Sequence, residues 1–208
     1  MESVRDRKVS TRTMTLNGQG QVTLVPDMAV IRLGVELTGS DLEEIQSRNA
    51  EQTQAVLDVL RGMGIEDIKT FQFTIDKYFE NDNGTQVDRG FRVRNILEIR
   101  TQDLDQAGAL IDTAVSAGAN VVDLISFELS DPERYYLQAL NLAVDEAIAK
   151  ARSIASEIDL RLDPTPVSIT ETGSAPRPSM TFRSEFAATP VVPGNLAIEA
   201  NVTAEFTY

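Results

Sequence analysis

Residues 68–101 read IKTFQFTIDKYFENDNGTQVDRGFRVRNILEIRT, and this stretch decides the fold. Its two ends, residues 68–79 and 91–101, are rich in β-branched and aromatic side chains, which favour strands. Between them, residues 81–84 (Asn-Asp-Asn-Gly) are of types that tolerate positive φ and therefore predict a turn. We expect residues 68–101 to form a hairpin.

Patterns on both sides extend the hairpin to a βαββαβ unit. Before it, apolar residues alternate from residue 31 to 37 as in a strand, and Ser40 with Glu43 forms a capping box that starts a helix ending at Gly62 and Gly64. After it, residues 103–117 have helical spacing and residues 121–129 predict a strand. The order over residues 27–130 is the split βαβ arrangement of ferredoxin-like folds, with both helices on one face of an antiparallel sheet.

Further elements outside this unit predict a single α+β domain over residues 13–208. Residues 13–24 alternate as a strand. A long helix runs to about residue 158, with Asp131 before it and Pro132 at its start. A short strand at 167–171 and a terminal strand at 196–206 follow. Residues 173–194 contain four prolines and no periodicity, which predicts a long loop. Residues 1–12 are expected to be a flexible N-terminal segment.

The composition argues against several classes of function. The 208 residues contain no His, Cys or Trp, so catalysis would fall to carboxylates, Lys, Ser, Thr or Tyr in shifted environments. The formal net charge of -13 repels phosphate backbones, so we expect no nucleic-acid partner. No apolar run approaches the roughly 18 to 20 residues that a membrane-spanning helix needs. No pattern predicts a catalytic residue, a metal site or a cofactor.

Several short motifs carry a resemblance that spans almost the whole chain. They are MTLNGQG at 14–20, VPDMA at 25–29, GMGI at 62–65, AGAN at 117–120 and TPVVPG at 189–194. In this order and spacing they resemble the SIMPL-domain family. The resemblance implies an α+β fold, frequent export in bacteria, large ring-like or channel-like oligomers in some members, loose links to oxidative or envelope stress, and no established enzyme activity.

The cellular compartment depends on the N-terminus. Residues 1–8 are charged and show no apolar leader segment, in contrast to the exported members of the family. We expect a periplasmic or extracellular location if a leader has been removed, and a cytoplasmic one otherwise.

Two groups of residues are candidates for contacts with another copy or another protein. Small side chains recur every fourth residue on the long helix, at Ala139, Ala143, Ala147 and Ala151. Such a ridge lets another backbone come close; packing within the chain is the favoured interpretation, and contact with a neighbouring subunit is the alternative. The second group is Phe182, Arg183 and Phe186, which a purely solvated loop would not need.

Polar residues on the predicted strands and helices suggest a ligand site. Arg92 and Arg94 share one side of a strand and either face an anionic ligand or an acidic partner, or form the solvated face of an antiparallel sheet, which is the favoured interpretation. Asn49, Asn95 and Asn120 either form a structural network, which is favoured, or line a polar site. Asn120 is expected to be a turn residue in the left-handed region.

These observations predict a non-enzymatic, oligomer-forming protein of the bacterial cell envelope or exterior. The alternative is a binding module for a small anionic or peptide ligand that uses Arg92 and Arg94 or the loop around Phe182 and Phe186. A carboxylate-based hydrolase has no supporting pair of acidic residues in the sequence. The expected partner is the protein itself, and another protein is the second possibility.

Overall fold

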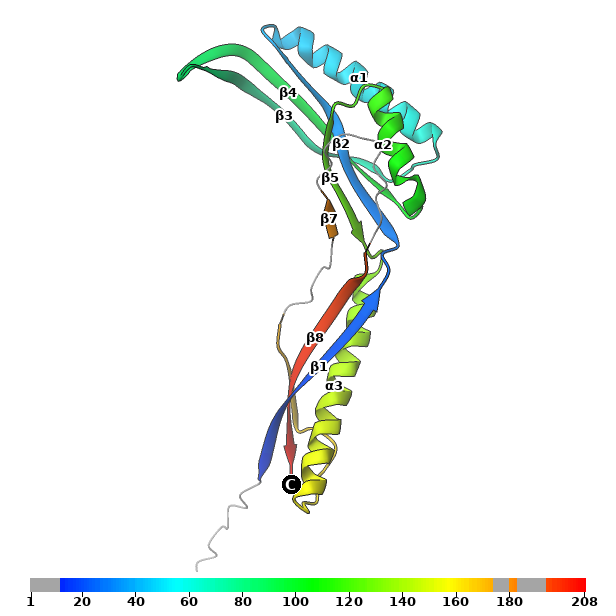
Figure 1. The fold of residues 1–208 in the computed structure, drawn as a ribbon, viewed down its shortest axis with the longest axis vertical. Helices are drawn as coiled ribbons and strands as arrows, with labels where there is room; N and C mark the ends of the chain where they lie inside the picture. The colour runs from blue at the N-terminus through cyan, green and yellow to red at the C-terminus, as the bar shows by residue number, and fades with distance from the viewer. Residues whose placement is uncertain (1–11, 174–179, 183–193) are drawn as a thin grey trace, which may run out of the picture. The chain divides into compact units, whose positions relative to one another are not determined.

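The computed structural model describes residues 12–173, 180–182 and 194–208, and Figure 1 shows their elements. In chain order these are β1 (Thr13–Leu24), β2 (Met28–Gly39), α1 (Leu42–Gly62), β3 (Ile68–Asp82), β4 (Thr85–Thr101), the short 3-10 turn η1 (Leu104–Gln106), α2 (Ala107–Ser116), β5 (Val121–Glu128), α3 (Pro132–Glu157), β6 (Ser168–Glu171), β7 (Met180–Phe182) and β8 (Leu196–Thr207). The α+β class predicted from the sequence is confirmed.

The described residues divide into two compact units. Unit 1 comprises the described parts of residues 1–24, 131–178 and 197–208, and unit 2 those of residues 25–130 and 179–196. The continuous part of unit 2 coincides closely with the βαββαβ segment expected at residues 27–130. The single domain predicted for residues 13–208 stays a prediction, and the expected flexible segment at residues 1–12 lies, except for Arg12, outside the described residues.

The sheet of unit 2 has the predicted ferredoxin-like topology. Among the described strands its order is β3-β4-β2-β5-β7, and each neighbouring pair is antiparallel. Strand β4 lies between β2 and β3, so β2, α1 and β3 form the split βαβ. The β3–β4 turn contains Asn83 at φ 51° and Gly84 at φ 89°, the positive values that a tight two-residue hairpin turn requires.

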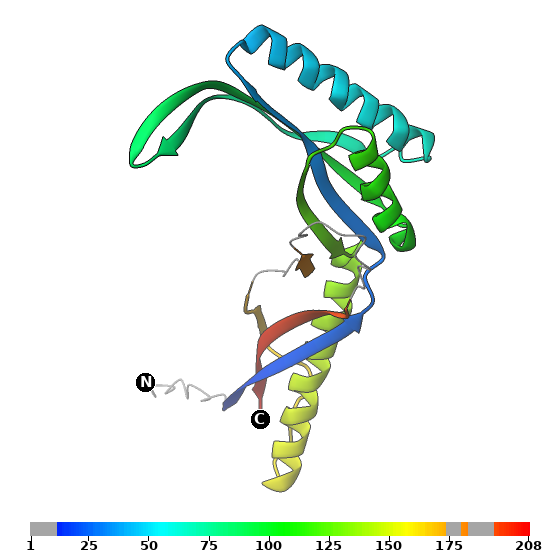
Figure 2. The same ribbon diagram turned by 45° about the horizontal axis from the view of Figure 1, so that its top comes forward.

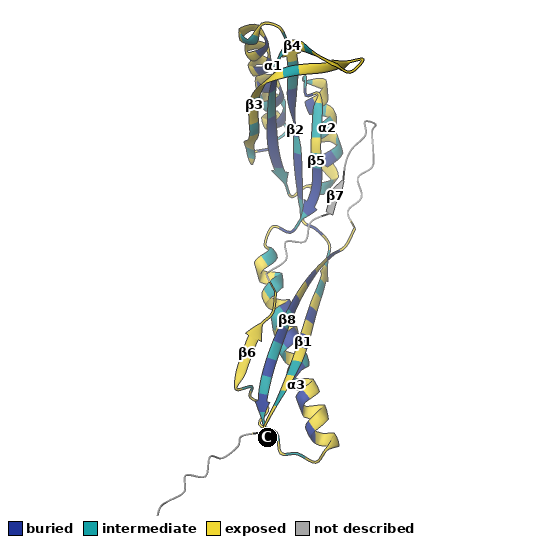
Figure 3. Ribbon diagram, turned by 90° about the vertical axis from the view of Figure 1, so that its left-hand side faces the viewer, coloured by how far each residue is buried: buried dark blue, intermediate teal, exposed yellow. Residues whose placement is uncertain are grey.

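Helices α1 and α2 cover one face of this sheet and enclose the main core (Figure 3). Leu33 and Leu97 on the strands pack in one cluster with Val56 and Leu60 of α1 and with Leu110 of α2. Burial of such side chains is the main favourable term in folding. The open face of the sheet is therefore the side on which charged residues collect.

The start of α1 differs from the sequence prediction. The N-cap is Asp41 rather than Ser40, and its carboxylate accepts hydrogen bonds from the backbone N–H groups of Glu43 and Glu44 at 2.9 and 3.1 Å. A carboxylate satisfies two otherwise unpaired donors and also interacts favourably with the helix dipole, which a hydroxyl one residue earlier does not.

Strand β7 was not predicted, because it lies inside the proline-containing stretch expected to be a loop. Its three residues pair antiparallel with β5, with Phe182 opposite Ile125. A strand this short has no room for a detectable alternation, and only the adjacent edge of β5 specifies it. Strand β4 also begins earlier than expected, at Thr85, which lengthens the hairpin.

Unit 1 is a sheet of β1, β8 and β6 in that order, with α3 on one face. Strand β8 alternates as predicted: every second residue from Leu196 to Phe206 is buried, and the residues between them are more exposed. Strand β6 pairs antiparallel with β8, with Ser168 opposite Glu205. The end of α3 at Glu157 agrees with the predicted long helix.

Candidate functional site

The alanine ridge of α3 is covered by the chain's own first strand. Ala139, Ala143, Ala147 and Ala151 are all 0% exposed. A Cβ added at Gly18 would lie 1.9 Å from the carbonyl oxygen of Ala143, and one added at Gly20 would lie 1.9 Å from that of Ala139. Packing within the chain, the favoured interpretation of the ridge, is what the structure shows. In this fold the four side chains offer no surface to a second copy.

Two side chains of α3 also occupy the outer edge of β1. The backbone N–H of Gln19 donates to Glu146 Oε2 at 2.6 Å, and Lys150 Nζ donates to the carbonyl of Asn17 at 2.9 Å. Glu146 and Lys150 pair with each other at 3.1 Å. Hydrogen bonds from Gln19 and Lys150 lower the pKa of Glu146. Backbone groups that would otherwise be open to another strand are taken at this point of the edge.

Two pockets with polar lining residues lie along β8 in unit 1. One, of about 260 Å³, is lined by Tyr136, Gly173 and Asn201 among others, and the other, of about 350 Å³, by Gln19, Glu146 and Glu199 among others. The hydroxyl of Tyr136 donates to Glu171 at 2.5 Å, which raises the pKa of Tyr136. The lowered pKa of Glu146 is the reverse of what a general acid needs at neutral pH.

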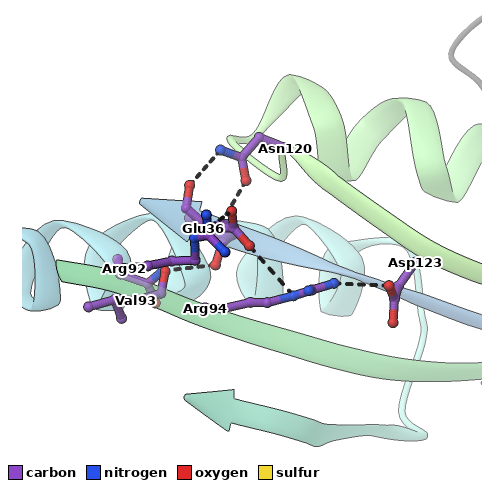
Figure 4. A network of polar contacts seen from close by, with 8 residues as sticks. Glu36, Arg92, Val93, Arg94, Asn120 and Asp123 are labelled. Carbon is purple, nitrogen blue, oxygen red and sulfur yellow. Dashed lines mark hydrogen bonds and ion pairs between the residues drawn. The ribbon is translucent and has the colours of Figure 1, made fainter. Parts of the chain in front are cut away.

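The predicted ligand face in unit 2 is a network of ion pairs on the open side of the sheet (Figure 4). The carboxylate of Glu36 lies 3.4 Å from Arg92 Nε and 3.8 Å from Arg94 Nε, and Arg94 also pairs with Asp123 at 2.9 Å. The ring of Tyr78 lies 4.4 Å from the Arg92 guanidinium carbon. Both arginines are therefore already ion-paired within the sheet, although their buried Nε atoms have no hydrogen-bond partner among the described residues.

A second charge cluster on the same face was not predicted from the sequence. Glu98 is only 2% exposed. Its carboxylate forms ion pairs with three cations: Arg32 at 2.8 Å, Lys69 at 2.9 Å and Arg100 at 3.1 Å. Burial alone would raise the pKa of Glu98, but the hydrogen bonds from Lys69, Arg32 and Arg100 outweigh it and lower the pKa to about 2. The cluster ties β2, β3 and β4 together. Its signal in the sequence was a lone acid between Arg94 and Arg100 on the outward side of the strand.

Two of the three asparagines, Asn49 and Asn120, hydrogen-bond to backbone groups of the sheet. Asn49 on α1 donates to the carbonyls of Val35 at 2.9 Å and Val93 at 3.3 Å. The side chain of Asn120 accepts from the N–H and donates to the carbonyl of Glu36, both at 2.8 Å (Figure 4).

The conformation predicted for Asn120 was wrong. The positive φ, 118°, belongs to Gly118, which absorbs the turn. Asn95 has a buried Oδ1 with no hydrogen-bond partner in the described part of the chain.

The outer edge of β3 exposes a strip of large apolar side chains, here called the β3 strip: Phe71, Phe73, Ile75 and Phe79, which are 45%, 51%, 38% and 50% exposed. Figure 3 shows exposed residues along this strand. In the described sheet β3 is an edge strand, and its second side pairs with no other described strand. A long edge that carries exposed apolar residues is a surface on which another chain can pair.

The end of the β3–β4 hairpin projects beyond its neighbours as a two-stranded arm (Figure 2). Among the described strands, residues 79–88 pair only with each other, because β2 pairs with β4 from Phe91 onward. Two ion pairs join β3 to β4 near the base of the arm: Lys77 pairs with Asp88 at 3.2 Å, and Glu80 pairs with Arg89 at 2.9 Å. An isolated two-stranded ribbon is only marginally stable in water, so these cross-strand pairs help to hold it.

The predicted contact residues in the loop lie mostly outside the described part of the chain. Phe182 is the last residue of β7, whereas Arg183 and Phe186 are not described. Within residues 12–173, 180–182 and 194–208, no group of three or more Asp and Glu side chains is placed to hold a metal ion. No helix in this part of the chain has the length and apolar character needed to cross a membrane.

Comparisons with known proteins agree on one family. The family model described as "SIMPL: Protein of unknown function (DUF541)" matches residues 14–206. The chain is 28% identical over 180 residues to the 26 kDa periplasmic immunogenic protein of Brucella melitensis, covering 83% of this chain and 72% of that protein. It is 25% identical over 150 residues to the uncharacterized protein YggE of Escherichia coli K12, covering 71% of this chain and 61% of that protein.

Proposed function

This chain belongs to the SIMPL family, and on that premise we propose that it is a non-enzymatic protein of the bacterial cell envelope or exterior whose task is to assemble with copies of itself. The relatives from two Brucella species are named periplasmic proteins, which supports the compartment. The oligomers that the family resemblance implies support the assembly.

The observation that carries the proposal is the β3 strip. Exposed apolar residues scattered singly are ordinary on a protein surface, but several close together on one strand favour a contact site. Phe73 and Ile75 share the face that α1 covers, whereas the Phe71 ring lies 3.6 Å from the guanidinium carbon of Arg32. Three phenylalanines and an isoleucine lie within nine residues of one edge strand. They expose apolar surface whose burial on assembly would be worth roughly 25 cal/mol per Å² before the costs of association.

The charged features of the described residues support a structural role rather than catalysis. Glu98 is held ionised by three cations, and the arginines of the open face are paired with Glu36 and Asp123. A catalytic acid or base needs a pKa near the working pH, whereas the carboxyl pKa values of Glu98, Glu146 and Asp88 are all lowered.

Sedimentation velocity over a wide concentration range tests the proposal. We expect the wild-type chain to sediment as a species larger than its 22.8 kDa protomer. The double variant Phe73→Thr/Ile75→Thr keeps residues with strand propensity and should shift the protein toward the monomer.

Ile169→Thr is the matched control. Ile169 is 49% exposed and also lies on an edge strand, β6, so its replacement should leave the distribution unchanged. A wild-type chain that stays monomeric at every concentration contradicts the proposal. If Ile169→Thr dissociates the assembly and the β3 double variant does not, the interface includes β6 rather than the β3 strip.

A further inference from the structure

We infer that the outer edge of β3 receives the β3 strand of a second copy in antiparallel orientation, related by a two-fold axis at Thr74, so that two protomers share one continuous sheet. This inference rests on the proposed self-assembly and names the surface and the pairing that would produce it.

The backbone edges of the two sheets differ in how they are protected. At β1, Glu146 and Lys150 occupy the N–H of Gln19 and the carbonyl of Asn17. Strands β6 and β7 are edges of only 4 and 3 residues. Strand β3 has 15 residues, and on its outer edge the structure places no described strand. Among the described residues, β3 is therefore a long edge strand without side chains that occupy its outer backbone groups as Glu146 and Lys150 do at β1.

The regular part of β3 has an alternation that suits a neighbouring strand. Bulges interrupt the pairing with β4 at Phe71 and at Tyr78, so residues 72–77 form the uninterrupted stretch. Within it, Phe73 is opposite Asn95 and Ile75 is opposite Val93, which is fully buried. Both apolar side chains therefore lie on the face that α1 covers. A strand added beside them would extend the apolar layer under that helix face.

Charge also favours this edge for the meeting of two copies. The protein carries a formal net charge of -13, which opposes self-association over most of its surface. Within residues 68–79 the charged side chains are Lys69, Asp76 and Lys77, and both lysines pair with carboxylates of β4, Glu98 and Asp88, so this stretch carries little net charge. Two copies therefore meet here with less repulsion than the net charge of the chain implies.

The side chains select one register. With the two-fold axis at Thr74, Phe73 lies opposite Ile75 of the other copy and Asp76 lies opposite Gln72. An axis at Phe73 would bring Lys69 opposite Lys77, and an axis at Asp76 would bring the two Asp76 carboxylates together, which is unfavourable. An axis at Ile75 would place Phe73 opposite Lys77 and lose the contact between Phe73 and Ile75.

The absence of cysteine allows a direct test by cross-linking. Opposite residues in an antiparallel pair have Cα atoms about 4.5 to 5.5 Å apart, which is within the range of a disulfide. In the variant Thr74→Cys the two introduced residues face each other, so mild oxidation should give a covalent dimer of twice the protomer mass. Thr170→Cys, on the exposed edge β6, is the matched control for random collision and should remain largely uncrosslinked.

A mixing experiment tests the register. Gln72→Cys and Asp76→Cys should each cross-link poorly alone, because four residues separate the two copies of either position, about 13 Å along the strand. A mixture of the two variants should give the covalent dimer. Circular dichroism of each variant checks that the fold is retained.

The outcomes distinguish the inference from the proposal on which it rests. If the wild-type chain assembles but Thr74→Cys cross-links no faster than Thr170→Cys, the β3 pairing is wrong while self-assembly stands. If the mixture of Gln72→Cys and Asp76→Cys gives no more dimer than either alone, the register is wrong. If the wild-type chain is monomeric throughout and Thr74→Cys does not cross-link, both are overturned.

Discussion

The carboxylate of Glu146 accepts a hydrogen bond of 2.6 Å from the backbone N–H of Gln19. Glu146 lies on α3 and Gln19 on the edge strand β1, so a helix side chain reaches around the strand to its outer side. Lys150, one helical turn further, accompanies it by donating to Asn17. The pair acts as a cap on the edge of the sheet.

We predict that removing this cap exposes β1 to pairing with other chains. The double variant Glu146→Ala/Lys150→Ala should aggregate faster on heating, because the N–H of Gln19 and the carbonyl of Asn17 become available. The amide proton of Gln19 should exchange several-fold faster by NMR. Asp145→Ala, an exposed change on the same helix, is the control. Unchanged exchange at Gln19 in the double variant would show that the cap is not formed in solution.

Gly18 should be intolerant of any side chain. Because a Cβ there would lie 1.9 Å from the carbonyl oxygen of Ala143, Gly18→Ala must push α3 away from β1, at a cost of about 3 kcal/mol or more in the free energy of unfolding. Urea denaturation measures this. Gly108→Ala is the control: nothing lies within 4 Å of its added Cβ, and alanine favours the α2 helix by up to about 1 kcal/mol. Equal stability of the two variants would mean that the close approach of β1 to α3 does not exist.

Glu98 should make stability depend on pH in the acid range. Its pKa is lowered from 4.5 to about 2 in the folded state, which corresponds to about 3 kcal/mol. Between these values the unfolded chain binds the proton more readily. The stabilisation is therefore complete above about pH 4.5 and is lost as the pH falls toward 2. Unfolding free energies of wild type and Glu98→Gln between pH 2.5 and about pH 7 measure it.

The two proteins should differ most at neutral pH and converge in acid. The control is Glu80→Gln, which breaks an exposed ion pair with Arg89 and should cost about 1 kcal/mol or less. A constant difference between wild type and Glu98→Gln across this pH range would contradict the assignment of the lowered pKa to Glu98.

Asp27 should stabilise the end of unit 2 at which β2 begins and the chain leaves β5. Its carboxylate accepts hydrogen bonds from both the N–H and the hydroxyl of Ser130, each at 2.7 Å. We expect Asp27→Ala to lower the unfolding midpoint measured by calorimetry, because both donors of Ser130 lose their partner. Asp123→Ala, which removes a partly exposed acid from the arginine network, should lower the midpoint less. A midpoint for Asp27→Ala that is no lower than that for Asp123→Ala would show that the hydrogen bonds to Ser130 do not stabilise the fold.

Much of the fold could be predicted because local patterns and packing agree. The alternation in β8, the proline at the start of α3 and the turn at Asn83 and Gly84 all indicate the structure that forms. The predictions that failed concern choices that depend on neighbours. Asp41 rather than Ser40 caps α1, and Gly118 rather than Asn120 adopts positive φ. Both candidates in each pair satisfy the local rule, and the backbone path set by the rest of the fold selects one.

The sequence by itself determined the order of helices and strands, the faces they bury and the family to which the chain belongs, because hydrophobic periodicity and turn residues act over a few neighbouring positions. Only the tertiary structure decided the roles of side chains distant in sequence. It placed Gly18 under Ala143, surrounded Glu98 with cations from three strands, paired Arg94 with Asp123 and left Phe73 exposed at an edge. These outcomes depend on which side chains the paired strands and packed helices bring together, and that pairing register and packing are long-range properties that no local pattern encodes.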